Sequence, residues 1–198
     1  MADSPLWLSA PRYFLAGLGV PASWTIHDVY GLDEELLSIL PQPVGAVILL
    51  YPFNDKVYFK NKQEEEQESS DKEVSEKVYF MKQFVGNACG TVALIHAIAN
   101  NLDKIELADG ALKDFMDKTS SMSSEERGHA LETDEGISKA HEESAQEGQT
   151  EAPDRETEVN EHFVSLVEDA AKVCRQFMDR DPEESRFAVV ALAAGPTE

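Results

Sequence analysis

Cys89 is the side chain whose position best suits nucleophilic chemistry in this sequence. It falls in the first turn of a helix predicted over residues 87–101, for which Asn87 is the predicted N-cap. The stripe that predicts this helix consists of Ala88, Val92, Ile95 and Ala99. Unpaired amides and the positive end of the helix dipole stabilise a thiolate at such a place, and the thiolate is the reactive form of cysteine. From position alone, a small buried core residue is the commoner alternative.

Gln83 lies six residues before Cys89, ahead of the predicted helix. Its side-chain amide could donate to the oxyanion of a tetrahedral intermediate, together with the backbone N–H of Cys89. A solvated polar residue in a strand-to-helix turn is the plainer interpretation of Gln83.

A thiol hydrolase also needs a base, and the chain has five histidines. His96 is seven residues along the same helix, about 10 Å from Cys89 at the rise of an α-helix, which is too far to take its proton. His162 begins a strand predicted over residues 162–167 and shares its face with Val164 and Leu166, so a sheet could present it rigidly. A hydrogen-bonded histidine on a strand edge is the alternative.

The remaining patterns predict a mixture of strands and helices, hence an α+β or α/β fold in one domain over residues 1–198. Apolar runs predict strands over 44–51, which is buried on both faces, and 187–192, while 78–81 has strand-like composition. Helices are predicted over 33–40, capped by Asp33, and over 169–178, with Cys174 facing inward. Two acidic stretches, about 60–77 and 123–161, predict loops.

Composition excludes several classes of protein. The 198 residues carry 17 basic and 38 acidic side chains, a net charge of −21, which argues against nucleic acid or an anionic membrane and favours a basic partner. Two cysteines exclude a disulfide scaffold and fit a reducing compartment, so we expect a cytoplasmic or nuclear protein. No zinc spacing, P-loop or dinucleotide pattern occurs, so we expect no metal or cofactor. No signal peptide or membrane span is predicted, since the longest apolar run is 44–53.

One segment is far more specific than these patterns. Residues 78–91 read VYFMKQFVGNACGT and are followed by LIHA at 94–97. They closely resemble the active-site signature of the ubiquitin carboxyl-terminal hydrolases. Further matches lie at 28–31, 147–150, His162-Phe163 and 180–182, so the resemblance covers nearly the whole chain and is to the short, single-domain members.

The resemblance implies a papain-like cysteine-protease fold, a central antiparallel sheet flanked by helices. It implies a deubiquitinating thiol hydrolase that cleaves adducts at the C-terminal glycine of ubiquitin, in ubiquitin-dependent protein catabolism. Carried over, Cys89 is the nucleophile, Gln83 the oxyanion donor and His162 the base. The stretch about 123–161 becomes the loop that restricts the leaving group, the partner is ubiquitin or a ubiquitin-like protein, and the chain is expected to be a monomer.

The sequence departs from the family after Val167. There the family continues into a turn and a neighbouring strand whose Leu-Asp-Gly motif carries the catalytic Asp, whereas here Val167 is followed directly by Glu168 and Asp169. Roughly thirty residues of strand, turn and loop are absent. We expect this deletion to perturb the sheet and weaken catalysis, unless Glu168 or Asp169 replaces the carboxylate. The alternatives to an active enzyme are a catalytically impaired ubiquitin-binding protein and a truncated chain that does not fold stably.

Overall fold

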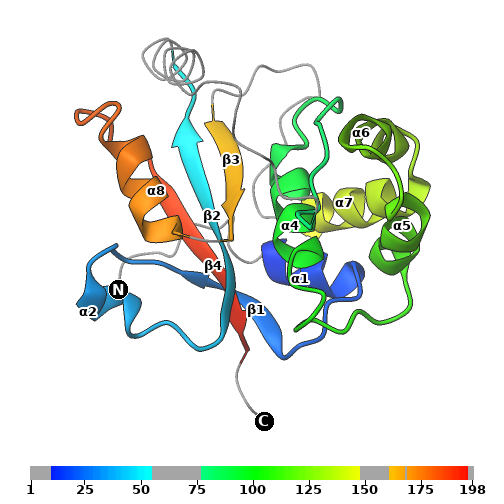
Figure 1. The fold of residues 1–198 in the computed structure, drawn as a ribbon, viewed down its shortest axis with the longest axis horizontal. Coiled ribbons are helices and arrows are strands. Elements are labelled where there is room, and N and C mark those ends of the chain that lie inside the picture. Colours follow the sequence, from blue (N-terminus) through cyan, green and yellow to red (C-terminus); the bar gives the residue numbers. More distant parts are fainter. Residues whose placement is uncertain (1–9, 55–76, 148–160, 168, 196–198) are drawn as a thin grey trace.

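The computed structural model describes residues 10–54, 77–147, 161–167 and 169–195 (Figure 1). The strands are β1 (Trp24–Asp28), β2 (Val44–Pro52), β3 (Glu161–Leu166) and β4 (Ala188–Ala194). The helices are α1 (Ala10–Gly17), α2 (Glu34–Leu37), α4 (Cys89–Ala99), α5 (Ala111–Thr119), α6 (Ser124–Glu132), α7 (Glu135–Glu147) and α8 (Ala170–Met178). The acidic loop predicted about residues 60–77 lies, apart from Lys77, outside the described residues.

The four strands form one antiparallel sheet in the order β1-β4-β2-β3. Strand β2, the predicted apolar run, is internal, because Leu49 pairs with Val164 of β3 on one side and with Val189 of β4 on the other. The α+β class with an antiparallel sheet and flanking helices is therefore confirmed. Within the described sheet, strand β3 pairs only with β2. The segment that this sequence lacks after Val167, compared with the family it resembles, therefore does not interrupt the ladders between the four strands.

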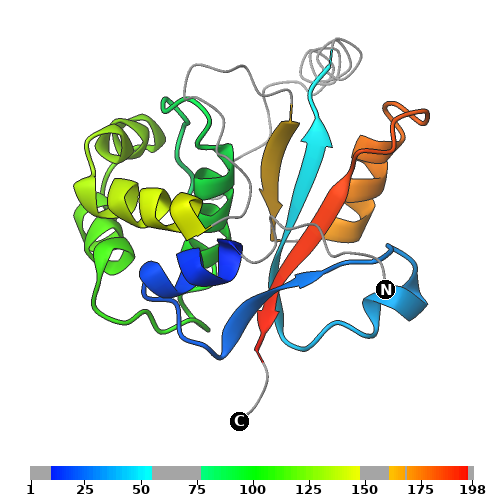
Figure 2. The same cartoon turned by 180° about the vertical axis from the view of Figure 1, so that it is seen from behind.

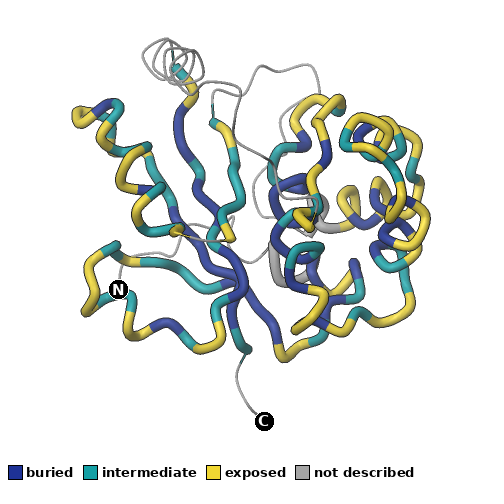
Figure 3. The backbone as a smooth tube through the Cα atoms, in the orientation of Figure 1, coloured by how far each residue is buried: buried dark blue, intermediate teal, exposed yellow. Residues whose placement is uncertain are grey.

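Each face of the sheet buries its own apolar cluster. On one face, Ile48 and Leu192 pack with Ile95 and Ile98 of α4. Helices α1, α5, α6 and α7 lie on the same side of the sheet, beyond α4 (Figures 1 and 2). On the opposite face, Leu49 packs with Cys174 of α8. Helix α4 lies between the sheet and the remaining helices and is dark blue along most of its length in Figure 3. Its apolar surface is thus wider than the predicted single stripe, because it packs on two sides.

Two local predictions around α4 are wrong. Residues 78–81 form no strand, because their backbone bonds to side chains of α4: Tyr79 N–H donates to Asn100 Oδ1 and Met81 N–H to His96 Nε2. Asn87 is not the N-cap of α4. The cap is Ala88, and Asn87 lies one residue earlier with φ of 55°, a left-handed conformation that asparagine tolerates.

The loop predicted about residues 123–161 is also wrong over its first 25 residues, which form α6 and α7. Helix α6 begins with a capping box, in which the Ser123 hydroxyl accepts from Glu126 N–H and the Glu126 carboxylate accepts from Ser123 N–H. Helix α7 buries Ile137 and Ala140. The acidic residues of these helices whose burial is described are exposed: Glu125, Glu126, Glu132, Glu135, Glu142 and Glu143. Residues 148–160 lie outside the described residues.

Candidate active site

Cys89 is the first residue of α4 and a half-buried free thiol. Because Ala88 provides no side-chain acceptor, the N-cap leaves the first amides of the helix without a side-chain cap. The left-handed Asn87 turns the chain sharply before the helix begins. The sequence therefore folds so that a thiol and unpaired backbone N–H groups meet at one helix end. The second cysteine, Cys174, is fully buried beneath the sheet, and burial raises its pKa to about 11.

His162 is the second residue of β3 and pairs with Tyr51 of β2. Its imidazole meets the Tyr51 ring edge to face, with centroids 6.0 Å apart, and lies 5.9 Å from the Phe53 ring. These apolar neighbours partly desolvate the imidazole, and that burial lowers its pKa. A histidine with a lowered pKa is neutral at physiological pH, which is the form a general base needs.

No Asp or Glu among the described residues hydrogen-bonds or ion-pairs with His162. Asp169, one of the two carboxylates considered as replacements, is the exposed N-cap of α8 with φ of 50°. Glu168 lies outside the described residues. The imidazole is therefore oriented by aromatic contacts and not by a carboxylate of the described chain.

The chain segments that carry Cys89 and His162 lie against each other. A Cβ placed on Gly90 would be 3.5 Å from the ring of Phe163, so the residue after Cys89 contacts the residue after His162. Tyr51 contacts the His162 ring. Burial raises the pKa of its hydroxyl, and the charge of Cys89 makes a smaller contribution in the same direction. Cys89 and His162 share no hydrogen bond in this structure. Such bonds are often loose before substrate binds.

Gln83 lies in the segment without regular structure that leads into α4, and it is exposed. Its side-chain amide donates one N–H to the carbonyl of Val85, with a nitrogen–oxygen distance of 3.0 Å. A glutamine amide has two N–H groups, so this bond fixes the orientation of the amide and leaves the second N–H for another acceptor. Gln83 is not bonded to Cys89 or His162.

The other histidines have partners elsewhere. Nε2 of His96 accepts a hydrogen bond from Met81 N–H at 3.0 Å, and burial lowers its pKa to about 4. The His27 ring bonds to the carbonyl of Ala194, and His129 lies 2.6 Å from the Glu132 carboxylate. His96 is thus a neutral acceptor that holds the chain before Cys89, a role the sequence analysis did not assign.

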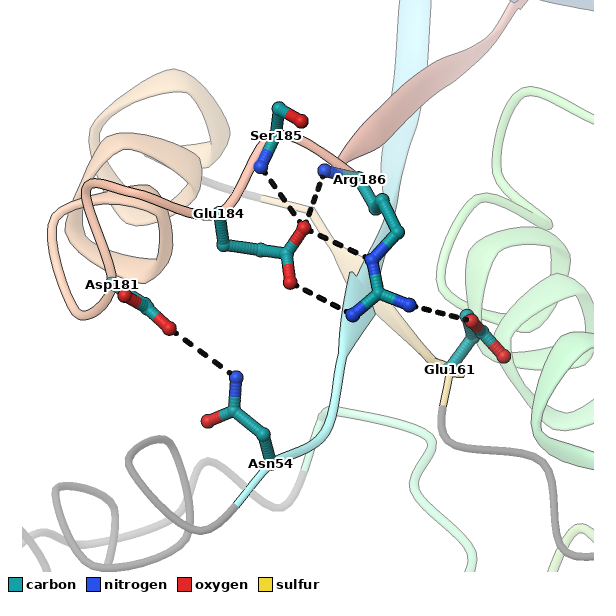
Figure 4. A network of polar contacts seen from close by, with 6 residues as sticks. All are labelled: Asn54, Glu161, Asp181, Glu184, Ser185 and Arg186. Carbon is teal, nitrogen blue, oxygen red and sulfur yellow. Dashed lines mark hydrogen bonds and ion pairs between the residues drawn. The ribbon is translucent and has the colours of Figure 1, made fainter.

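A polar network next to β3 was also not found from the sequence (Figure 4). The Glu184 carboxylate accepts from the backbone and guanidinium of Arg186, and these hydrogen bonds lower its pKa to about 2. Arg186 also lies 3.7 Å from Glu161, the first residue of β3. The Asn54 amide, just after β2, donates to Asp181. The network joins the start of β3, the end of β2 and the loop before β4.

The residues that the structure describes contain no group of three or more His, Cys, Asp or Glu side chains that could hold a metal ion. Among the same residues, no helix has the length and apolar character needed to cross a membrane.

A free cysteine at the start of a buried helix and a histidine on an adjoining antiparallel sheet are the arrangement expected of a cysteine hydrolase of α+β type. The family model described as ubiquitin carboxyl-terminal hydrolase, family 1, matches residues 10–175. A ubiquitin carboxyl-terminal hydrolase from Drosophila melanogaster is 43% identical over 211 residues, covering 91% of this chain and 92% of the relative. Isozyme L1 from Homo sapiens is 42% identical over 208 residues, covering 90% and 91%. The chain therefore belongs to family 1 of the ubiquitin carboxyl-terminal hydrolases, which are cysteine-type deubiquitinating enzymes.

Comparison with solved structures gives the same fold. The UCH37 catalytic domain of Trichinella spiralis, crystallised with ubiquitin vinyl methyl ester, has a TM-score of 0.69 at 21% identity and covers 98% of this chain and 94% of that one. The Drosophila alignment spans 211 positions, whereas 91% of this 198-residue chain is only about 180 residues. About 30 positions of that alignment thus hold no residue of this chain, which agrees in size with the segment predicted to be absent after Val167.

Proposed function

We propose that the chain hydrolyses adducts at the C-terminal glycine of ubiquitin with Cys89 as nucleophile and His162 as general base. His162 takes the thiol proton while Sγ forms a bond to the glycine carbonyl carbon. The bond from that carbon to the leaving group breaks, and His162 returns the proton to the leaving group. Water then hydrolyses the thioester and releases the ubiquitin carboxylate and the free thiol.

The observation that carries this proposal is the contact between Gly90 and Phe163, which lays the residue after the proposed nucleophile against the residue after the proposed base. Tyr51, on the strand that pairs with β3, contacts the His162 ring. The hydrogen bond between Sγ and the imidazole would form when substrate binds, since catalytic hydrogen bonds are often long or poorly aligned before that. No other histidine among the described residues adjoins a free, accessible thiol.

Gln83 is proposed as the side-chain donor to the oxyanion, acting with the backbone N–H of Cys89. The bond to Val85 orients its amide, and the second N–H is the one that would donate. Replacing Gln83 with Ala should lower the acylation rate by about 10²–10³ and leave ubiquitin affinity nearly unchanged. A loss of affinity with no loss of rate would make Gln83 a binding residue instead.

Ubiquitin as the partner is supported by the family and by the net charge of −21, which would attract a basic surface. We propose that the chain acts as a monomer in the cytoplasm or nucleus, where a reducing environment keeps Cys89 a thiol. We propose that the stretch about 123–161, whose described part includes α6 and α7, restricts the leaving group.

The direct test is hydrolysis of a fluorogenic ubiquitin C-terminal amide by the wild type, Cys89→Ser and Cys174→Ser. The wild type and Cys174→Ser should turn over, whereas Cys89→Ser should bind ubiquitin without turnover. Turnover by Cys89→Ser at the wild-type rate would refute the mechanism.

A second candidate, a ubiquitin-binding protein with impaired catalysis, is favoured by one observation: no carboxylate of the described residues contacts His162. Inserting the family's strand–turn–strand with its Leu-Asp-Gly after Val167 separates the two candidates. If the orienting carboxylate limits the rate, the insertion should raise hydrolysis by about 10³-fold or more, and the same insertion with Asn for Asp should not. Equal rates with and without the insertion would mean that another group serves His162.

A further inference from the structure

The segment from Tyr79 to Val85, which carries Gln83, contains no helix or strand, so individual contacts determine its position. On one side α4 holds its beginning, through the bond from Met81 N–H to His96 and two bonds between the Tyr79 backbone and the Asn100 amide. These bonds end at Met81, two residues before Gln83. The placement of Gln83 itself must therefore also depend on contacts from outside α4.

Helix α6 supplies the contacts on the other side. The guanidinium of Arg127 donates to three carbonyls at 3.1 Å each: Phe80 in the segment, and Thr119 and Ser120 at the end of α5. Its carbon also lies 4.2 Å from the centroid of the Tyr79 ring, a cation–π contact. One planar, permanently charged group thus joins the segment to two helices, a geometry that the point charge of a lysine would not reproduce.

The backbone of α6 also lies directly on the residues flanking Gln83. Lys82 N–H donates to the carbonyl of Ser124 at 2.9 Å. A Cβ on Gly128 would be 2.1 Å from the carbonyl oxygen of Lys82 and 2.8 Å from the Phe84 ring. Only glycine allows so close an approach, because the nearest atom belongs to backbone and cannot rotate away. The Phe84 ring in turn stacks on His129 of the same helix, with centroids 4.1 Å apart.

We propose that α6 is the template that sets the position of the oxyanion donor, with Arg127 and Gly128 as positioning residues that act through Gln83. The inference rests on the proposed role of Gln83. It goes beyond that role because it assigns a catalytic consequence to a helix that carries none of the proposed catalytic residues. In this arrangement the donor is placed from two sides: by α4, whose first residue is the nucleophile, and by α6, which fixes Lys82 and Phe84.

The test uses Arg127→Gln and Gly128→Ala in the full chain, each alone and combined with Gln83→Ala. Arg127→Gln removes the clamp, and Gly128→Ala pushes the Lys82 carbonyl away while keeping every hydrogen-bond donor. Each single variant should lower kcat by about tenfold or more, up to the 10²–10³ of losing the donor itself, with KM changed less than about twofold. The matched control is Glu125→Gln, which removes the exposed 3.1 Å ion pair between Lys82 and the same helix and should leave kcat unchanged.

The double variants distinguish positioning from a general structural role. If Arg127 and Gly128 act through Gln83, adding either change to Gln83→Ala should cause no further loss of kcat. Losses that multiply in the double variants would overturn the proposal, as would single variants with wild-type kcat. A wild type without any turnover would overturn the proposed function together with this inference, whereas an active wild type with multiplying losses would overturn the inference alone.

Discussion

The half-buried His96 predicts a pH dependence of stability that one substitution should remove. Its Nε2 accepts the Met81 N–H, its ring stacks on Phe80 at 5.2 Å, and burial lowers its pKa from the ordinary 6.5 to about 4. Because the folded state favours the neutral imidazole, the stability contributed by His96 is complete above pH 6.5. It is lost as the pH falls from 6.5 towards 4, where the unfolded chain binds a proton that the folded chain does not.

The magnitude follows from the size of this shift. A difference of about 2.5 pKa units corresponds to a total loss of about 3 kcal/mol once the pH is below 4. Between pH 7.5 and 5.5 the loss from His96 alone is about 1.4 kcal/mol, because only the unfolded state titrates in that interval. The partial burial of His162 acts in the same direction, so the wild type should lose somewhat more.

The assay is urea unfolding of the wild type and of His96→Gln at pH 7.5 and 5.5. A glutamine oxygen can occupy the place of Nε2 and accept the Met81 N–H without titrating, so the variant should lose about 1.4 kcal/mol less than the wild type over this interval. His96→Asn is the control for the hydrogen bond. It is too short to reach Met81 and should cost about 1–3 kcal/mol at both pH values. Equal pH dependence in the wild type and His96→Gln would refute the reasoning.

Three further outcomes are expected. Ile95→Ala should lower the free energy of unfolding by about 2–5 kcal/mol in urea, because Ile95 is fully buried between the sheet and the helices; a loss below 1 kcal/mol would contradict that packing. Iodoacetamide should alkylate half-buried Cys89 in the native protein well before Cys174, whose pKa is about 11, and mass spectrometry showing the reverse order would count against both assignments. Ser123→Ala should cost about 1 kcal/mol by removing the capping box of α6, and an unchanged thermal midpoint would show that the cap does not contribute.

The elements that the sequence predicted well are those whose pattern is local. The apolar run at 44–51 became β2 (Val44–Pro52), the short run at 162–167 became β3, and Asp33 caps α2 as expected, accepting from Leu36 N–H. Cys89 falls at the start of α4 because an apolar period follows it directly. In each case the local pattern of residue types is enough to predict the element, although distant strands complete the ladders of β2 and β3.

Other helices were missed although a signal was present. Leu112, Phe115, Met116 and Thr119 recur at helical spacing, and all four are buried in α5. In α6 and α7 the acidic composition outweighed a capping box and the buried Leu131, Ile137 and Ala140. Composition describes the exposed face of such helices, whereas the few apolar positions determine whether they fold.

Contacts between distant parts of the chain could not be predicted. No residue near Phe80 in the sequence indicates that Arg127 donates to the Phe80 carbonyl. Gly128 likewise has nothing unusual around it in the sequence. Only the folded structure places the carbonyl oxygen of Lys82 2.1 Å from a Cβ built on Gly128. The same holds for Tyr51, which becomes the neighbour of His162 only through the register of β2 and β3.

The two halves of the proposed site are supported unequally. The half with Cys89 and Gln83 is held by a buried helix, by hydrogen bonds with His96 (which accepts from Met81 N–H) and with Asn100, and by the clamp from α6. The half with His162 depends on one ladder to β2, two aromatic contacts and an exposed 3.7 Å ion pair from Arg186, a kind of pair that contributes little. In serine proteases, replacing the aspartate that orients the catalytic histidine costs about 10⁴ in rate. We therefore expect the orientation of His162, and not the nucleophile or the oxyanion donor, to limit the activity of this chain.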